Sequence, residues 1–284
     1  MATVREALTA SVDALTAAGV DTPRLDAEVL LAEASGWDRA RLAADPEAAV
    51  PASVARRFGE MVRRRLRREP VAYIVGRRGF RHLDLAVDRR VLIPRPETEL
   101  LVDLALELQP GSVLDVGTGS GAVALAIADE LSGCRVVATD TSAAALEVAA
   151  ANAERLGLGE RVRFLADSVP ADGEFDLVVA NLPYIASGEW PGLQPEVTQW
   201  EPREALLAGA DGLDAIRALL SGRVRHLSDQ ARQMTNAAVV IALEVGEGQA
   251  AAVGELLHAA GFGSVETRVD LAGIERVVIG RSGA

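Results

Sequence analysis

The first 70 residues of the chain place apolar side chains three and four positions apart, the spacing of one face of an α-helix. The first such segment ends at Gly19, a residue that commonly terminates helices. The second begins with Thr22, a candidate N-cap, and Pro23, which is well tolerated at the first helical position. A third segment runs from about Ala52 to Arg68. The pattern therefore predicts a small helical bundle over residues 1–70.

Residues 71–95 follow a different pattern. The stretch FRHLDLAV alternates apolar and polar positions, which predicts one strand of a β-hairpin. The stretch IPRPE follows as a rigid link, and helical spacing resumes in ETELLVDLALEL. We therefore expect residues 71–95 to form a hairpin linker between a helical domain and a second domain.

From Ser112 onward, short apolar runs alternate with helical segments. The runs SVLDVG, RVVATD, VRFLAD and FDLVVANLPY are separated by GAVALAIADEL and AAALEVAAANAERL. This rhythm is typical of βαβ units, so it predicts a parallel sheet with helices on both faces. AAVVIALEVG, SVETRVD and ERVVIG are expected to close the sheet. Residues 96–284 are thus predicted to form one α/β domain.

Composition narrows the function classes. Apolar residues make up 49% of the 284 residues, which is enough for a substantial core. The single cysteine, Cys134, excludes a disulfide framework and a cysteine-rich metal site. His82, His226 and His258 are too widely spaced for a metal-ligand pattern. The sequence shows no signal peptide and no apolar run long enough for a membrane helix, so we expect a cytoplasmic protein without a metal.

The net charge of −12 is unevenly distributed. Residues 1–90 hold 16 arginines against 13 acidic residues, or +3, whereas residues 91–284 hold 13 against 28, or −15. An acidic second half is a poor electrostatic match for a nucleic-acid backbone. The arginine-rich stretch that ends at Pro70 is either a solvated helix face or a patch for an acidic partner.

A glycine-rich loop joins the first strand of the second domain to a helix. Gly117, Gly119 and Gly121 alternate with Thr118 and Ser120 in this loop. Glycine permits a positive φ and a close approach of a ligand to the backbone, and the following helix offers free amides at its N-terminus. Gly117 and Gly119, with an alanine three residues later, also fit a variant of the dinucleotide fingerprint. The loop alone therefore indicates a nucleotide-like ligand without choosing which one.

Two acidic residues favour one cofactor class. Asp140 closes the next strand, where a carboxylate can bind the ribose hydroxyls of NAD or of S-adenosylmethionine. Asp115 precedes the glycine loop, where it would oppose a pyrophosphate but tolerate a cationic sulfonium cofactor. The pair favours S-adenosylmethionine over a dinucleotide.

The stretch Asn181-Leu182-Pro183-Tyr184 follows an apolar strand and should reach the same crevice as the glycine loop, because ligands lie beyond the carboxyl ends of such strands. It is either an asparagine-capped turn or a site that orients a planar amino group. In the second interpretation, the Asn181 side-chain oxygen and the Leu182 carbonyl accept hydrogen bonds from the NH2 group. Pro183 stiffens the turn, and Tyr184 provides a flat wall. Catalysis would then consist mostly of orientation and electrostatics.

Several segments occur together in one order, and together they resemble the peptide-chain release factor N5-glutamine methyltransferases of the HemK/PrmC family. The segments are EPVAYIVGRRGF, VLIPRPETELLVD, VLDVGTGSGAVALAIA, FDLVVANLPYI, EVTQWEPREALLAGADGLDAIR and DLAGIERVVIG. The resemblance implies a seven-stranded, Rossmann-like class I methyltransferase domain after a helical substrate-docking domain. It also implies S-adenosylmethionine as donor, S-adenosylhomocysteine as product, and a class 1 release factor as protein substrate, with the glutamine of its Gly-Gly-Gln motif as acceptor.

The resemblance also implies residue roles. Gly117, Thr118, Gly119, Ser120, Gly121, Asp140, Asp167 and Asn181 would bind the cofactor; Asn181, Leu182, Pro183 and Tyr184 would bind the substrate glutamine; and Asn181, Pro183 and Tyr184 would be the catalytic set. Asp167 is expected to reach the adenine amino group. Glu196, Trp200 and Arg203 are expected to support a loop that covers the site. We expect a monomer that binds neither nucleic acid nor membrane.

The chain departs from the family pattern at two positions. Leu182 replaces the usual first proline of the tetrapeptide, and Ser168 stands where some relatives place an aromatic residue against the adenine. Because Asn-Leu-Pro-Tyr also occurs in ribosomal RNA adenine dimethyltransferases, the tetrapeptide alone does not choose between glutamine and adenine. An adenine-N6 methyltransferase acting on RNA or DNA therefore remains the alternative, and a non-catalytic cofactor-binding scaffold is a third hypothesis.

Overall fold

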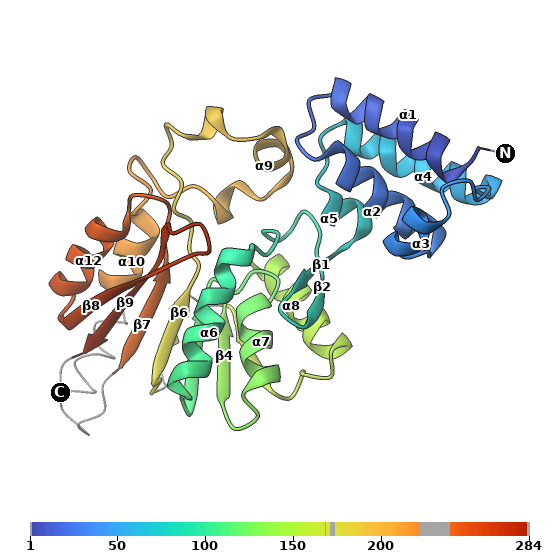
Figure 1. Ribbon diagram of the computed structural model, residues 1–284. Coiled ribbons are helices and arrows are strands. Elements are labelled where there is room, and N and C mark those ends of the chain that lie inside the picture. Colours follow the sequence, from blue (N-terminus) through green and yellow to red (C-terminus); the bar gives the residue numbers. More distant parts are fainter. Residues whose placement is uncertain (1, 168, 171–173, 222–238, 283–284) are drawn as a thin grey trace. The chain divides into compact units, whose positions relative to one another are not determined.

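The computed structural model describes residues 2–167, 169–170, 174–221 and 239–282, so Ser168 and His226 lie outside the described residues. The chain forms two compact units (Figure 1). The first unit contains the chain up to Arg77 together with Gln194–Trp200. The second contains Arg78–Leu193 and the chain from Glu201 onward. A short segment from the second half of the sequence therefore belongs to the N-terminal unit.

The N-terminal unit is helical, as the apolar spacing predicts. Its helices are α1 (Val4–Ala17), α2 (Pro23–Ser35), α3 (Arg39–Ala44), α4 (Ala52–Leu66) and α5 (Val71–Val75), and the returning segment adds α9 (Pro195–Trp200). The sequence did not predict α3 and α5, because elements of six and five residues are too short to show a helical period. Leu15, Leu30 and Leu31 are fully buried in the core of this unit. Thr22 occupies the N-cap position of α2, but its hydroxyl donates to Asp26 instead of capping the helix.

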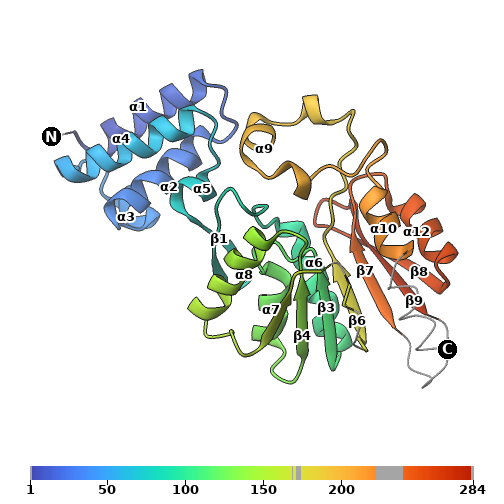
Figure 2. The same cartoon turned by 180° about the vertical axis from the view of Figure 1, so that it is seen from behind.

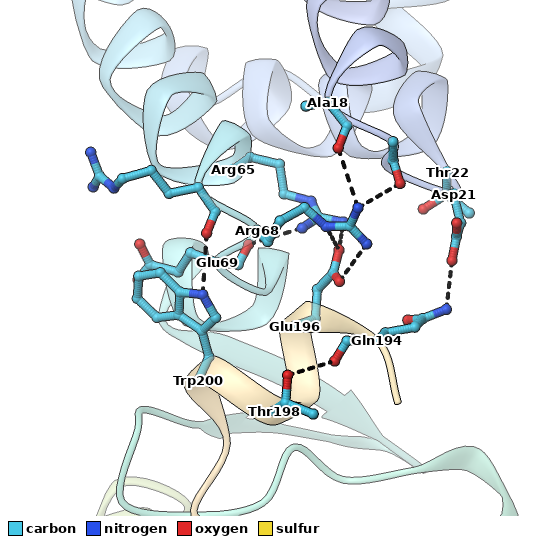
Figure 3. Close-up of polar contacts among 12 residues, drawn as sticks. Ala18, Asp21, Thr22, Arg65, Arg68, Glu69, Gln194, Glu196, Thr198 and Trp200 are labelled. Atoms are coloured by element: carbon cyan, nitrogen blue, oxygen red, sulfur yellow. Dashed lines mark hydrogen bonds and ion pairs between the residues drawn. The ribbon is translucent and has the colours of Figure 1, made fainter. Parts of the chain in front are cut away.

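The segment Gln194–Trp200, called here the clasp segment, is held against the N-terminal helices by side-chain pairs (Figure 3). Glu196 accepts hydrogen bonds from Arg68 Nε at 2.8 Å and Nη2 at 2.6 Å, and its carboxylate lies 2.7 Å from Arg65 Nη2. Trp200 Nε1 donates to the backbone oxygen of Arg67 at 3.3 Å. The structure thus uses Glu196 and Trp200 to join the clasp segment to the N-terminal helices, whereas the sequence suggested that they support a loop over the site.

Replacing Glu196 with alanine should lower the free energy of unfolding by about 1–3 kcal/mol, because a charged partner is removed from two poorly hydrated arginines. Arg65 is only 5% exposed and keeps Asp26 as its remaining carboxylate partner. The measurement is urea unfolding followed by circular dichroism.

Glu47→Ala is the matched control, because Glu47 also pairs with an N-terminal arginine, Arg5, but both side chains are more than 60% exposed. Its effect should stay within about 0.5 kcal/mol. Burial by itself raises the pKa of Glu196, but the hydrogen bonds from Arg68 and Arg65 outweigh it, so the pKa lies below its ordinary value. The contribution of Glu196 should therefore be present at neutral pH and disappear as the pH falls below 4.5 toward that lowered pKa. Equal losses in the two variants at neutral pH would contradict the assignment.

The second unit begins with a hairpin and contains a seven-stranded sheet within its described residues. The hairpin pairs β1 (Arg77–Phe80) with β2 (Leu83–Ala86). The sheet has the order β5-β4-β3-β6-β7-β9-β8, in which β9 runs antiparallel to both of its neighbours. Its strands are β3 (Ser112–Val116), β4 (Arg135–Thr139), β5 (Val162–Leu165), β6 (Leu177–Ala180), β7 (Val240–Glu244), β8 (Phe262–Val269) and β9 (Glu275–Ser282). The predicted seven-stranded, Rossmann-like sheet is confirmed.

Helices cover both faces of this sheet, as Figures 1 and 2 show from opposite sides. Their bounds are α6 (Glu99–Leu108), α7 (Ala122–Glu130), α8 (Ala143–Arg155), α10 (Asp214–Ser221) and α12 (Ala250–Ala259), with short 3-10 turns at Pro96–Thr98, Trp190–Gly192 and Arg203–Ala205. Val113 packs with α6, α7 and α8, whereas its neighbour Leu114 packs with α10 and α12. This alternation follows from the two-residue period of a strand.

The strand order creates the site. The chain proceeds from β3 to β4 and β5 on one side and then returns to β6 on the other side of β3. At such a reversal the loops that follow the two strands diverge and leave a crevice beyond the carboxyl ends. The glycine loop after β3 and the Asn181 stretch after β6 meet at this point.

Candidate active site

A cavity of about 210 Å³ lies at the carboxyl ends of β3, β4 and β6, within the second unit. Residues from four post-strand loops line it, together with the turn before α6 and the stretch after the clasp segment. The lining includes Gly117, Thr118, Gly119 and Ser120; Asp140, Thr141 and Ser142; Asp167; Asn181, Leu182 and Pro183; Arg95 and Thr98; and Pro202, Glu204 and Ala205. Gly121 and Tyr184 adjoin these loops in sequence but are not part of the lining.

The glycine loop takes a backbone path that other residues would strain. Gly117, Gly119 and Gly121 have φ values of +76°, +57° and +85°. A Cβ at Gly121 would also lie 2.9 Å from the Leu125 side chain, so this position requires glycine for close packing as well as for its conformation. The backbone N–H groups of Gly117 and Thr118 both donate to the Thr139 carbonyl at 2.9 Å. The loop is therefore held in shape by the protein itself.

Asp115 fixes this loop to the following helix. It is 2% exposed and accepts hydrogen bonds from the Thr118 hydroxyl at 2.6 Å and the Ala124 backbone N–H at 3.2 Å. Burial raises the pKa of Asp115 to about 7, the two hydrogen bonds oppose the rise, and the charge of Asp140 adds to it. The sequence suggested an electrostatic role toward a cofactor; the structure gives the carboxyl group a role in shaping the loop.

Asp140 links the glycine loop to the next one. Its carboxylate accepts hydrogen bonds from the backbone N–H of Gly119 at 2.9 Å and of Ser142 at 2.8 Å, one on each oxygen. A carboxylate oxygen can accept two hydrogen bonds, so each one keeps capacity for a ligand hydroxyl. Asp140 is therefore a preorganised acceptor at the cavity wall.

Asn181 is oriented by a residue that sequence reasoning did not single out. Its Nδ2 donates to the hydroxyl of Thr98 at 3.0 Å, and Thr98 is 4% exposed. The donor side of the Asn181 amide is thus engaged inside the protein, which leaves Oδ1 as the acceptor for a ligand. Thr98 lies in the segment VLIPRPETELLVD, where the sequence predicted the start of a helix and the family resemblance implied no role for this residue.

Leu182 and Tyr184 are positioned by close backbone approaches. A Cβ at Gly117 would lie 3.0 Å from the Leu182 side chain, so the leucine occupies the space above that glycine. The Tyr184 carbonyl accepts a hydrogen bond from Gln249 Nε2 at 2.9 Å, and a Cβ at Gly212 would lie only 2.2 Å from the same oxygen. Burial raises the pKa of Tyr184 to about 12, and the nearby Glu244 adds to the rise, so its phenol is neutral at physiological pH. The sequence did not predict the role of Gln249. Gly212, in the stretch DGLD, is the sequence feature that could have indicated a close backbone contact here.

An ion pair joins two of the segments that carry the family resemblance, VLIPRPETELLVD and EVTQWEPREALLAGADGLDAIR. Glu201 is buried and accepts from Arg95 Nη2 at 2.5 Å and from the Ile93 backbone N–H at 3.2 Å. This interaction ties the IPRPE turn to the stretch after the clasp segment. Arg203 stacks over the ring of Trp190, with its guanidinium carbon 5.3 Å from the ring centre.

The structure therefore brings together nearly all of the predicted site residues. The cofactor candidates except Gly121 line the same cavity as Asn181, Leu182 and Pro183. Tyr184 follows directly along the chain. The description does not extend to Ser168.

Comparison with known proteins identifies the family. A family model described as "PrmC N-terminal domain" matches residues 6–76, and one described as "Methyltransferase domain" matches residues 113–200. A release factor glutamine methyltransferase from Cereibacter sphaeroides is 42% identical over 278 residues, which cover 97% of each chain. The chain belongs to the release factor glutamine methyltransferase family. The expected resemblance is confirmed, and the protein is a methyltransferase enzyme.

Other members of the release factor glutamine methyltransferase family agree with this assignment. The protein of that name from Xylella fastidiosa is 44% identical, with 94% of this chain and 96% of the relative covered. The Moorella thermoacetica protein is 43% identical, with 96% of each covered. The hMettl16 catalytic domain, solved in complex with a 3′UTR hairpin, superimposes with a TM-score of 0.55 at 16% identity over 70% of this chain and 75% of the other, which supports the fold alone. Among the described residues, no helix is long and apolar enough to span a bilayer.

Proposed function

We propose that this enzyme transfers a methyl group from S-adenosylmethionine to the side-chain amide nitrogen of the glutamine in the Gly-Gly-Gln motif of class 1 peptide-chain release factors. The observation that carries the proposal is the fixed amide of Asn181, which lines a cavity shared with the glycine loop and whose oxygen accepts no hydrogen bond from the described residues. The names of the full-length relatives support a release factor as the substrate.

The residues around the cavity suit an S-adenosylmethionine molecule. The positive-φ glycine loop offers backbone close to the ligand, and Asp140 offers acceptors for ribose hydroxyls. Asp167 and Asn181 line the same cavity. Asp167 is proposed to reach the adenine amino group, and Asn181 is proposed to contact both the cofactor and the substrate. When bound, the cofactor supplies an electrophilic methyl group on a positively charged sulfur.

The chain's own contribution to transfer is orientation. An amide nitrogen is a poor nucleophile because its lone pair is delocalised into the carbonyl group. The Asn181 Oδ1 atom and the Leu182 carbonyl are proposed to accept the two N–H bonds of the substrate glutamine, so that the nitrogen lone pair points at the methyl carbon. Pro183 stiffens this turn, and Tyr184 is proposed as a flat wall beside the amide plane. The displaced amide proton is lost to water after transfer, so no strong base is required.

The N-terminal unit is proposed to dock the release factor away from the reacting loop. The exposed arginines Arg56, Arg63 and Arg67 of the α4 region offer a positive surface for an acidic protein. The release factor would then be held at two places, by this surface and by the cavity.

The test combines cofactor binding with methyl transfer. Calorimetry should show binding of S-adenosylmethionine or S-adenosylhomocysteine and no binding of NAD. Label from methyl-labelled cofactor should enter an intact class 1 release factor and be absent when its Gly-Gly-Gln glutamine is replaced by glutamate. A short Gly-Gly-Gln peptide should be a much poorer substrate, because it lacks the docking contacts.

The alternative has a distinct outcome. The tetrapeptide Asn-Leu-Pro-Tyr also suits an adenine amino group, so RNA and DNA belong in the same assay. Transfer of label to nucleic acid, with none to the release factor, would replace the proposal by an adenine-N6 methyltransferase. The net charge of −15 over residues 91–284 opposes that outcome, because a polynucleotide requires a basic track.

A further inference from the structure

Glu244 is a buried acidic residue at the carboxyl end of β7, next to the strand that carries Asn181. It is 2% exposed, and its Oε2 atom has no hydrogen-bond partner among the described residues. In the parallel pairing of β6 with β7, Ala180 lies opposite Leu243, so Asn181 and Glu244 each follow the last paired residue. A carboxyl group of this kind is costly to bury, which points to a role beyond packing.

Thr98 connects Glu244 to Asn181. The Thr98 hydroxyl lowers the pKa of the Glu244 carboxyl group, which places the two side chains close together, and it accepts a hydrogen bond from Asn181 Nδ2 at 3.0 Å. A hydroxyl has one hydrogen to donate, and an ionised carboxylate can only accept. While Glu244 is ionised, Thr98 must therefore give its hydrogen to Glu244 and must accept from the NH2 group of Asn181. The opposite orientation of the Asn181 amide would leave two acceptors facing each other.

We propose that Thr98 and Glu244 are positioning residues that fix the side-chain amide of Asn181 so that its oxygen, and not its NH2 group, faces the substrate. The inference rests on the proposed function, in which Asn181 Oδ1 accepts a hydrogen bond from the amide that is methylated. Glu244 orients the Thr98 hydroxyl, and Thr98 in turn orients the Asn181 amide. Neither Thr98 nor Glu244 needs to touch the reacting atoms.

Protonation of Glu244 would reverse the direction of this chain of hydrogen bonds. A neutral carboxyl group can donate to Thr98, which frees the Thr98 hydrogen to bond the Asn181 oxygen instead. Burial raises the pKa of Glu244 to about 7; the Thr98 bond and the positive charges of Arg276 and Arg95 lower it, and Glu97 raises it. Tyr184, which also faces Glu244, is neutral in this range. Activity should therefore decline as the pH falls through about 7.

The first experiment compares Thr98→Val with Thr98→Ser. Valine keeps the shape but removes the hydroxyl, so kcat on the release factor should fall about 10–100-fold, while KM and the cofactor Kd change by less than about threefold. Serine keeps the hydroxyl and should restore most of the rate. Equal rates in the two variants, or a loss of cofactor binding in parallel with the loss of rate, would overturn the proposal.

The second experiment uses the pH profile. The wild-type rate should fall below about pH 7, whereas the rate of Glu244→Gln should not, because glutamine cannot change its charge. At high pH the variant should be slower than the wild type. The pKa of Asp115 is also raised to about 7, but Asp115 is unchanged in this comparison, so a difference between the profiles reports on Glu244. If Glu244→Gln lost activity below about pH 7 as the wild type does, another group would cause that loss, and the proposed effect of Glu244 protonation would be refuted.

A third measurement separates this inference from the proposed function. The sequence contains three asparagines, so the side-chain NH2 signals of asparagine-labelled protein are few, and Asn181→Ala identifies the relevant pair. The Asn181 signals should show slow hydrogen exchange in the wild type and in Thr98→Ser, and fast exchange in Thr98→Val. If the wild type fails to methylate a release factor but this exchange pattern holds, the proposed function fails while the positioning network stands. Fast exchange in the wild type would refute the network whatever the substrate.

Discussion

An Asn181→Ala protein should fold normally and bind the cofactor, yet transfer methyl groups on the order of 10²–10³ more slowly than the wild type. The expected loss follows from the geometry of the site. Asn181 is half-buried at the cavity wall, and its Nδ2 is engaged by Thr98, so its oxygen is the preorganised acceptor for the substrate amide. Without the Asn181 oxygen, the substrate amide can turn so that its nitrogen lone pair no longer points at the methyl carbon.

The measurement is single-turnover transfer to a release factor, with circular dichroism to confirm folding. Asn152→Ala is the contrasting control. Asn152 is fully buried, and its side chain bonds the backbone of Ala86 and Ser120 inside the fold. That variant should lose stability, by about 2–4 kcal/mol, because several buried backbone groups lose their partner. If a folded Asn181→Ala protein turned over at a near-normal rate, the stretch after β6 would be an ordinary turn.

Asp140→Ala should weaken S-adenosylmethionine binding by about 100-fold, because two charge-assisted hydrogen bonds to ribose hydroxyls, each of about 1.5 kcal/mol, would be lost. Asp140 also accepts from the backbone N–H groups of Gly119 and Ser142, so the variant loosens the loop as well. Calorimetric titration with S-adenosylhomocysteine measures the effect without the need for a protein substrate.

Two controls separate the contributions at Asp140. Asp140→Asn keeps the size of the side chain and one acceptor but loses the charge, so its affinity should fall between those of the wild type and the alanine variant. Glu160→Ala removes an exposed acidic residue of the same unit that lies outside the cavity lining, and it should bind normally. Unchanged affinity in Asp140→Ala would mean that this carboxylate serves only to shape the loop.

Most of the longer elements of both units could be predicted from the sequence because their signals are local. The strand Ser112–Val116, the glycine loop and the helix Ala122–Glu130 follow one another within twenty residues, and each shows its own period or turn residues. The same local logic placed Asn181 at the end of a strand in the crevice, since parallel strands of a doubly wound sheet end on the same side. This reasoning placed most of the lining residues that were expected, namely those of the glycine loop, Asp140 and Asn181.

The sequence by itself thus determined most of the longer elements, the parallel part of the sheet and the loops that meet at the site. That β9 runs antiparallel to its neighbours was decided by the tertiary structure. Tertiary structure alone decided that Glu196, the first residue of the segment EVTQWEPREALLAGADGLDAIR, packs on Arg65 and Arg68 of the N-terminal unit. It also decided that Thr98 and Glu244 lie beside Asn181. The physical reason is the same in both cases: a polar pair separated by scores of residues leaves no period in the sequence, and an isolated carboxylate looks alike whether it is solvated or buried. Only the packing that removes water from Glu196 and Glu244 distinguishes them from the many exposed acidic residues of this chain.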